Sequence, residues 1–222
     1  MARRPGLKLD LHVHTVYSYD GFLTPRELVS TARRIGLDGV AITDHDSVEA
    51  HRRIRQDKGI VIIPGIEVSS AGGHILGLNV SCDIPPGLSA EETIERIHDA
   101  GGIAIASHPN SPFFFWKDSF MGKRIARLKF DAVEVVNSAI FPFYALTRLN
   151  RRLARALNLP TTGGSDSHFA STVGRAYTIV EAHSSDIDDL IQAILSNKST
   201  AFGLPRTVVE RTRAAMYRMF LV

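Results

Sequence analysis

Cysteine is almost absent from this sequence, because its 222 residues include only Cys82. A single cysteine excludes an internal disulfide, and it leaves no cluster of thiolates that would favour a structural zinc site. The shortage of cysteine also suits a reducing compartment. We expect Cys82 to lie in a loop and to take no part in chemistry.

Long apolar runs and targeting signals are missing as well. No apolar run reaches the roughly 18 residues that a membrane-spanning helix requires. The chain starts with the basic segment 1–6, but strand-like sequence follows it in place of a signal-peptide core and cleavage site. We therefore expect a cytoplasmic protein with no membrane partner.

The excess of positive charge is small. Lys and Arg number 26 against 23 Asp and Glu, which gives a formal net charge of +3. Basic side chains cluster in segments 52–55, 123–127 and 148–155. Such clusters are typical of solvated helix faces, and the alternative is a positive field that attracts phosphates or nucleic acid.

Strand patterns and helix patterns alternate along the chain, with no linker, repeat or low-complexity tract between them. We therefore expect a single domain over residues 1–222, and the 44% hydrophobic residues suffice for its core. Strands are expected at 7–11, 38–43, 60–67, 74–80, 103–107, 130–136, 160–163 and 175–180. Helices are expected at 25–35, 47–56, 90–100, 142–157, 186–196 and 205–219. This alternation implies parallel βα units, arranged either as a barrel or as an open doubly wound sheet.

Two segments stand apart from the alternation. Residues Asn110–Met121 include the aromatic run Phe113–Trp116, which we expect to form a lid loop; stacking on a nucleobase is the alternative. The tail, residues 205–222, is expected to form a basic amphipathic C-terminal helix that packs on the barrel or at a subunit contact. The sequence leaves the oligomeric state open.

Side chains that bind metals follow one expected strand after another. They are His12 and His14, then Asp44 and His45, Glu67, His108, and finally Asp166 and His168, while His74 opens a further strand. The C-terminal ends of parallel strands meet at one end of a barrel, where barrels of this class keep their active sites. We therefore favour a barrel over an open sheet, with one polynuclear metal site at its end.

Five motifs carry a resemblance to a known family. In chain order they are Asp10-Leu11-His12-Val13-His14-Thr15, Ile42-Thr43-Asp44-His45, Gly65-Ile66-Glu67, Ser107-His108-Pro109 and Gly164-Ser165-Asp166-Ser167-His168. Together they resemble the motifs of the PHP family (polymerase and histidinol phosphatase). One such motif is weak evidence, but the full set over positions 10 to 168 is specific. The resemblance implies an α/β fold, a distorted (β/α)7 TIM-like barrel of the PHP type, and metal-dependent hydrolysis of phosphoesters.

The resemblance also implies a site for three divalent metal ions. His12, His14, Glu67 and Asp166 would hold the first ion, and Asp20, His45 and His168 the second. Glu67, as a bridge, would hold the third ion together with His74 and His108. Asp20 follows His14 by six positions, where many relatives have the acidic residue at five; a longer-spaced variant also occurs in the family.

The chemistry of these donors points the same way. Imidazoles and carboxylates suit borderline divalent ions such as Zn, Mn or Fe. Three such ions would bring six positive charges, of which Asp20, Glu67 and Asp166 offset three, so the pocket should attract a phosphate dianion. Bound ions lower the pKa of water to about 7, so that hydroxide can attack without a nucleophilic side chain.

Other residues are expected to support this site. Asp10 and Asp44 are expected to orient histidines through hydrogen bonds, and a purely structural role is the alternative for each. Arg175 and Arg148 are candidates to clamp a phosphate bidentately, and a surface ion pair is the alternative for each. Asn137 also lies near the end of an expected strand.

We therefore expect a metal-dependent phosphoric ester hydrolase that acts on a small phosphorylated metabolite or nucleotide through a metal-bound hydroxide. One alternative is a nuclease that trims short oligonucleotides, which the basic bias would favour. Another is a non-catalytic scaffold stabilised by metal. The complete set of donors argues against the scaffold, because inactive versions tend to lose ligands.

Overall fold

The computed structural model describes residues 6–54, 59–110 and 122–219. Its strands form one continuous sheet in the order β7-β6-β5-β4-β3-β2-β1-β8-β9. Their bounds are β1 (Leu7–Val13), β2 (Gly39–Ile42), β3 (Val61–Ser70), β4 (Gly73–Leu78), β5 (Ile103–Ala106), β6 (Ala132–Asn137), β7 (Thr161–Gly164), β8 (Ala176–Val180) and β9 (Ser199–Gly203). Eight of these strands match expected ones, whereas β9 was not expected.

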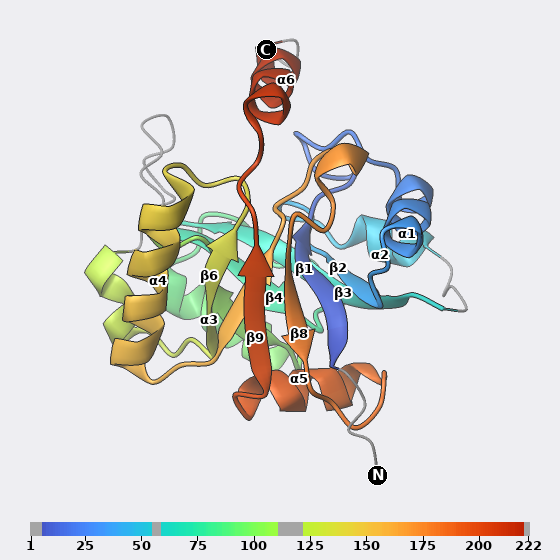
Figure 1. Cartoon of the computed structure of the whole chain (residues 1–222). Helices are drawn as coiled ribbons and strands as arrows, with labels where there is room; N and C mark the ends of the chain where they lie inside the picture. Colours follow the sequence, from blue (N-terminus) through green and yellow to red (C-terminus); the bar gives the residue numbers. More distant parts are fainter. Residues whose placement is uncertain (1–5, 55–58, 111–121, 220–222) are drawn as a thin grey trace.

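Strands β1 to β7 curl into a nearly closed barrel. The closing contact joins the end of β7 to β1, where the Asp166 backbone N–H donates to the His12 carbonyl at 2.8 Å and the His14 N–H donates to the Ser167 carbonyl at 2.8 Å. Gly164 permits this approach, because a Cβ atom there would lie 2.3 Å from the Cβ of His12. The mixed α/β fold with a distorted TIM-like barrel, expected from the motifs, is thereby confirmed (Figure 1).

The expectation of parallel pairing throughout is wrong at two places. β4 runs antiparallel to both β3 and β5, and β8 runs antiparallel to β1. The reason at β4 is the short connection: only Ala71 and Gly72 separate β3 from β4, whereas a parallel crossover needs a dozen residues or more. The start of β4 therefore lies at the same end of the barrel as the C-terminal ends of β3 and β5.

Helices cover the outside of the barrel (Figure 1). They are α1 (Pro25–Arg34), α2 (Glu49–Arg53), α3 (Ala90–Asp99), α4 (Phe143–Leu157), α5 (Ile187–Leu195) and α6 (Val208–Met219), with the 3-10 turns η1 (Gly122–Arg127) and η2 (Ala170–Thr172). The Thr24 hydroxyl accepts from the Glu27 N–H at 3.2 Å, and the Glu27 carboxylate accepts from the Thr24 N–H at 3.0 Å, so the capping box starts α1 as expected. No helix of the described residues is both long and apolar enough to cross a bilayer.

Helix α2 is shorter than expected. It begins after Val48, which makes no side-chain cap, and it ends at Ile54, whose backbone is extended. The Ser47 hydroxyl accepts from the Glu49 N–H at 3.2 Å, which closes a turn before the helix instead of capping it from the expected position.

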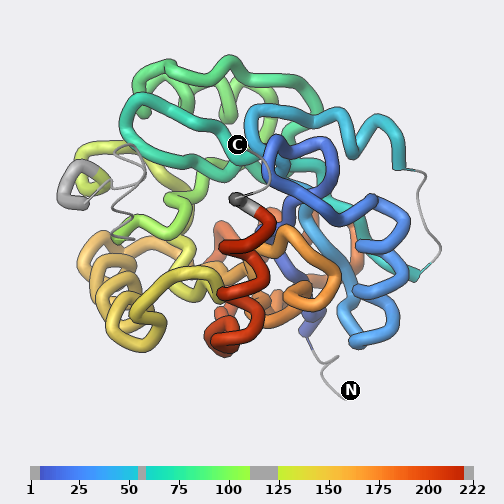
Figure 2. Tube along the Cα trace, turned by 90° about the horizontal axis from the view of Figure 1, so that it is seen from above, coloured from blue at the N-terminus to red at the C-terminus, as the bar shows by residue number. Residues whose placement is uncertain are grey.

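The two ends of the barrel differ in chemistry. Helix α5 packs Leu190, Ile191 and Ile194 against the barrel residues Leu9 and Leu11, and so closes the end where β1 begins. Each such side chain is buried, which stabilises the fold by about 1.5–3 kcal/mol. Helix α6 lies over the opposite end (Figures 1 and 2). The expected lid segment with Phe113 and Trp116 lies outside the described residues.

Candidate metal centre

The nine candidate ligands converge at the end of the barrel that α6 overlies. Strands β1, β3 and β4 or the loops after β1, β2, β5 and β7 carry them, and each residue's side chain is no more than 15% exposed. The nine residues are His12, His14, Asp20, His45, Glu67, His74, His108, Asp166 and His168. His74 belongs here only because β4 is reversed, which pairs His74 with Ser69 near the end of β3.

A local irregularity in β1 turns two histidines into the barrel. The register between β1 and β2 shifts between Asp10 and Val13, as in a β-bulge. Leu11 packs in the barrel core with α5, whereas Val13 packs on the outside with residues of α1. His12 and His14 flank Val13 on the opposite face of the strand, so both rings point inward.

Glu67 is the central group of the cluster. Its Oε2 lies 3.1 Å from His12 Nε2, 3.2 Å from His14 Nε2 and 3.4 Å from His45 Nδ1. Its Oε1 lies 3.4 Å from His74 Nδ1 and 3.2 Å from His108 Nε2. A carboxylate with histidines on both oxygens has the arrangement required of a bridge between metal ions.

Three groups of donor atoms could each hold one ion. Within each group all the atoms lie within 4.8 Å of one another: His14, Asp20, His45 and His168; His12, His14 and Glu67; and His45, Glu67 and His74. Asp20 reaches its group despite the six-residue spacing, with Oδ2 placed 2.8 Å from His168 Nε2. Asp166 Oδ1 lies 3.5 Å from His14 Nε2, beside the second group. The division of residues among particular ions stays a prediction.

The charge states of these groups suit cations. Burial disfavours the charged form of Glu67, but His12, His74 and His45 outweigh it and hold the pKa of this carboxyl well below its usual range. Burial lowers the pKa of His45 to about 3, which keeps its imidazole neutral. Burial opposes charge on His14 too, yet Asp166 and Glu67 raise the pKa of its imidazole to about 9. A divalent ion requires ionised carboxylates and neutral imidazoles, so Glu67 and His45 already have the required form, whereas binding of an ion by His14 would release the proton of its imidazole.

An unsatisfied ring nitrogen gives a direct test of fit. Among the described residues, the buried Nδ1 of His45 makes no hydrogen bond, and it faces Oε2 of Glu67 at 3.4 Å. The His14 ring lies 4.3 Å from that of His168 and 4.5 Å from that of His45, a spacing that protonated imidazoles would resist. Buried polar atoms without partners are costly, and a cation would satisfy them. The donor set therefore fits divalent metal ions.

Two candidate ligands have left-handed backbone. Asp166 has φ 52° and His108 has φ 29°, values that are uncommon for residues other than glycine. Hydrogen bonds hold both in place: the His108 N–H donates to Glu134, the Asp166 N–H to His12, and the Arg206 guanidinium to the Asp166 carbonyl. Strain of this kind, of order 1–3 kcal/mol each, concentrates at functional sites.

Glu134 is an important residue that the sequence analysis did not identify. This buried carboxylate on β6 places Oε1 2.9 Å from His12 Nδ1, and its Oε2 accepts from the His108 N–H at 2.9 Å. The Asn137 amide donates to Glu134 at 3.0 Å and to Asp166 at 3.1 Å. A signal was available, because Glu134 is the one acidic residue inside the apolar strand 132–137.

Asp10 and Asp44 act on backbone groups rather than on imidazole rings. Asp10 accepts from the N–H groups of Ser165 and Gly174, both at 2.8 Å, and burial raises its pKa to about 6. Asp44 accepts from the N–H and the hydroxyl of Thr15. They therefore fix the loops that carry His168 and Asp20, which differs from the expected contact with histidine rings.

For Arg175 the described contacts match the ion pair that the sequence left as the alternative to a phosphate clamp, and the clamp itself stays a prediction for both arginines. Arg175 forms an ion pair with Glu210 of α6, with Nη2 at 2.6 Å and Nε at 3.0 Å from Oε1. Arg148 lies on α4 and is exposed. Arg206, which was not expected at the site, is buried and donates to the backbone beside Asp166.

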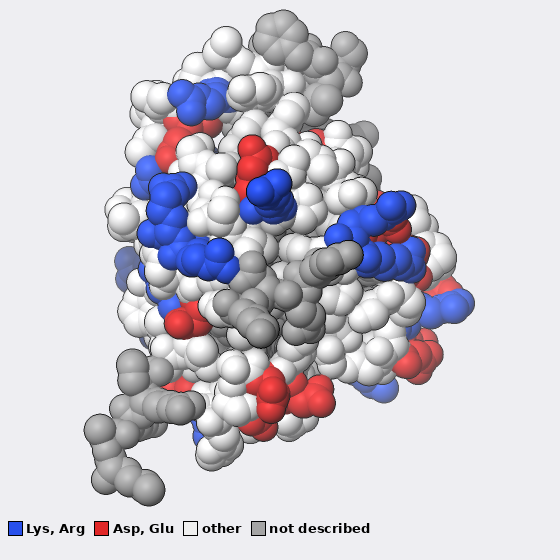
Figure 3. Space-filling view, turned by 90° about the vertical axis from the view of Figure 1, so that its right-hand side faces the viewer, with Lys and Arg blue, Asp and Glu red and all other residues white. Residues whose placement is uncertain are grey.

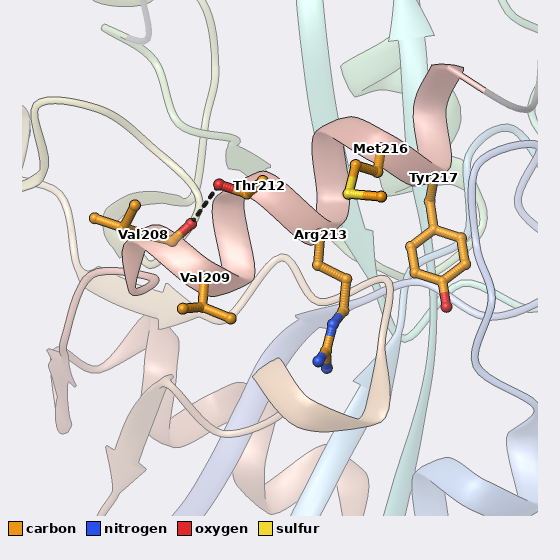
Figure 4. Close-up of a pocket in the computed structure, with 6 residues that line it drawn as sticks. All are labelled: Val208, Val209, Thr212, Arg213, Met216 and Tyr217. Atoms are coloured by element: carbon orange, nitrogen blue, oxygen red, sulfur yellow. Dashed lines mark hydrogen bonds between the residues drawn. The ribbon is translucent and has the colours of Figure 1, made fainter.

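A groove of about 580 Å³ lies along one side of α6 (Figure 4). Its described lining consists of Val208, Val209, Thr212, Arg213, Met216 and Tyr217. None of the nine candidate ligands is among these described lining residues. The Tyr217 ring packs on Phe22 and on Phe169, which follows the candidate ligand His168, so the groove begins beside the loops that carry the cluster.

Comparison with known proteins supports the family that the motifs suggest. A family model described as PHP-associated matches residues 147–199. An uncharacterized protein of Methanocaldococcus jannaschii is 39% identical over 145 residues, which cover 60% of this chain and 82% of that protein. A probable phosphatase of Enterobacter sp. is 28% identical over 203 residues, which cover 75% of this chain and 80% of that protein. The 5'-3' exoribonuclease Rnm of Escherichia coli is 40% identical over 85 residues, 34% of this chain and 29% of that protein.

Solved structures show the same fold. A two-domain protein from Bacteroides vulgatus contains a predicted PHP-like metal-dependent phosphoesterase and matches with a TM-score of 0.68 at 22% identity. The match covers 89% of this chain and 65% of that protein's chain. A lesion-specific endonuclease from Pyrococcus furiosus matches with a TM-score of 0.63 at 18% identity. This match covers 88% of this chain and 57% of the endonuclease chain. With this fold, these relatives and its motifs in order, the chain belongs to the PHP family.

Proposed function

We propose that this chain is a metal-dependent phosphoesterase that hydrolyses a small phosphorylated metabolite or a nucleotide. The observation that carries the proposal is the position of Glu67, whose two oxygens lie 3.1–3.4 Å from nitrogens of five buried imidazoles. Asp20 and Asp166 complete the donor set, and three divalent ions are the loading proposed for it. Bound ions would supply positive charge for the phosphate and would acidify water enough for attack near neutral pH.

The residues of the chain have defined tasks in this proposal. Glu67 would bridge two ions, and His12 and His14 would hold the first of them. Asp20 and His168, whose Oδ2 and Nε2 atoms lie 2.8 Å apart, would hold a second ion. Glu134 and Asp44 keep the donors and their loops in position without contacting substrate. None of these tasks requires a nucleophilic side chain.

A nuclease is the second candidate function. The 85-residue match to the exoribonuclease and the fold shared with the endonuclease both favour it. The face that carries α1 and α2 gives it less support, because Lys and Arg are interspersed there with Asp and Glu (Figure 3). Binding of a long strand through many phosphates would require a continuous basic track.

Metal content and salt dependence test these proposals. Protein purified without chelator should contain about three divalent equivalents per chain, and a chelator should abolish turnover of mononucleotides and sugar phosphates. A single tightly bound equivalent would contradict the trinuclear site. Metal-loaded protein that hydrolyses no phosphoester would instead favour the non-catalytic scaffold.

The dependence of activity on salt concentration distinguishes the small-molecule phosphoesterase from the nuclease. We expect turnover of small substrates to change little between low and physiological salt. Affinity for a single strand would fall by about 0.7 log units per log unit of salt for each phosphate contacted. A strong preference for long single-stranded RNA or DNA, with a steep salt slope, would replace the metabolite proposal with the nuclease.

A further inference from the structure

The first turn of α6 is fixed to two loops of the barrel by polar contacts. Glu210 pairs with Arg175, which precedes β8, with Oε1 placed 2.6 Å from Nη2. The Arg211 guanidinium donates to the carbonyls of Ala139 at 2.9 Å and Ile140 at 3.0 Å, in the loop after β6. One end of the helix is therefore anchored beside the barrel, at the end of the barrel where the candidate ligands converge.

An aromatic triad, made of Phe22, Phe169 and Tyr217, attaches the other end of α6. The Tyr217 ring lies 4.8 Å from that of Phe22 and 5.0 Å from that of Phe169, measured between centroids. The two phenylalanine rings stack on each other at 5.1 Å, with their planes at 7°. Each ring thus contacts the other two, and Tyr217 is the member that belongs to α6.

The two phenylalanines of the triad adjoin candidate metal ligands. Phe169 directly follows His168, and Phe22 lies two residues after Asp20. The Phe22 N–H donates to the His168 carbonyl at 3.0 Å, and Oδ2 of Asp20 lies 2.8 Å from Nε2 of His168. Tyr217 therefore packs on the two loops that supply Asp20 and His168, donors of one candidate ion site.

Helix α6 depends on these anchors, because it buries little surface of its own. None of the described side chains over residues 208–217 is buried, and Val208 is 80% and Met216 54% exposed. An isolated helix of 12 residues is marginal in water. Elements with few buried apolar contacts are the ones that open at low free energy. A small change in the loops beneath Tyr217 is therefore enough to shift the helix between a docked and an undocked position.

We propose that α6 is a gate over the metal-binding cluster, whose docking through the aromatic triad is linked to the ion held by Asp20 and His168. The proposal rests on the metal binding of the proposed function and adds a control over access to that site, since α6 overlies this end of the barrel (Figures 1 and 2). An ion bound to both donors would join their two loops and keep Phe22 and Phe169 paired beneath Tyr217. Linkage is reciprocal, so docking of α6 strengthens binding of this ion by the same factor.

Hydrogen exchange of the full chain tests the gate. The protein is treated with chelator and then titrated with Mn²⁺, while exchange of the α6 backbone amides is followed by mass spectrometry. We expect Mn²⁺ to slow this exchange about 5- to 150-fold, the usual range of coupling between two sites. Tyr217→Ala should lose the slowing and bind Mn²⁺ more weakly by up to the same factor. Tyr217→Phe keeps the ring and should behave like the wild type, as should Met216→Ala, the matched control on the same turn.

Variants of the ligands test which ion controls the gate. Asp20→Asn should abolish the effect of Mn²⁺ on α6, whereas His74→Ala, which alters a different donor group, should retain it. Equal slowing in Asp20→Asn and the wild type would overturn the proposal, and so would exchange in α6 that ignores Mn²⁺ bound by the wild type. Either result leaves the metal binding of the proposed function intact. A wild type that binds no Mn²⁺ would overturn the gate and the proposed function together.

Discussion

Glu134 holds His12 from the side opposite to Glu67. Its Oε1 lies 2.9 Å from Nδ1 of His12, while Nε2 of the same ring lies 3.1 Å from Oε2 of Glu67. A carboxylate at Nδ1 keeps the proton on that nitrogen and leaves Nε2 to face a metal ion. The other oxygen of Glu134 accepts from the His108 N–H and from Asn137, which in turn donates to Asp166. One buried side chain therefore positions donors from β1, β5 and β7.

We predict that Glu134→Gln lowers metal affinity by about 10- to 100-fold, as is typical when a residue that orients metal ligands is changed. An amide has one acceptor oxygen, so it cannot accept from His12 and from the His108 N–H at the same time. Metal titration of the purified variant measures the effect, with the exposed Glu95→Gln as control. Unchanged metal affinity in a folded Glu134→Gln would contradict this role.

The bridging position of Glu67 predicts an asymmetry between two variants. Glu67→Gln should lose bound metal and phosphoesterase activity together, because it alters the group that lies against five imidazoles. His74→Ala should keep the first metal and some turnover, because it contacts only one oxygen of Glu67. Bound metal and phosphoesterase activity should be measured on the same preparations of both variants. Full activity in Glu67→Gln would exclude Glu67 as a bridge between metal ions.

The ion pair between Arg175 and Glu210 predicts a role in stability. Arg175→Ala and Glu210→Ala should each destabilise the chain modestly, and a double-mutant cycle in urea should give a coupling of about 1 kcal/mol, because the pair is only partly buried. The exposed Arg152→Ala serves as control.

The same two variants test the expected phosphate clamp. If Arg175 only anchors α6, both variants should change KM alike. A large rise in KM for Arg175→Ala that Glu210→Ala does not share would instead identify Arg175 as a residue that contacts substrate.

Much of this fold follows from local sequence. The capping box from Thr24 to Glu27 and the Ser89 cap start α1 and α3 where they were expected, because each motif satisfies backbone groups within one turn. Most of the strand positions were predictable for the same reason, since alternation or an apolar run is a property of a few neighbouring residues. The order of the donors along the chain likewise indicated a single metal-binding cluster.

Other features depended on which distant segments meet. The reversal of β4 brings His74 to the cluster, and the weakly patterned β9 forms because β8 offers it a partner. Glu134 gains its role from His12 and His108, which are 122 and 26 residues away in the chain. The Tyr19 ring stacks on His45 only because the loop after β1 folds onto the end of β2. The sequence by itself determined which donors are present and at which strand ends. The tertiary structure alone decided their neighbours, because pairing and burial join atoms whose separation along the chain carries no local signal.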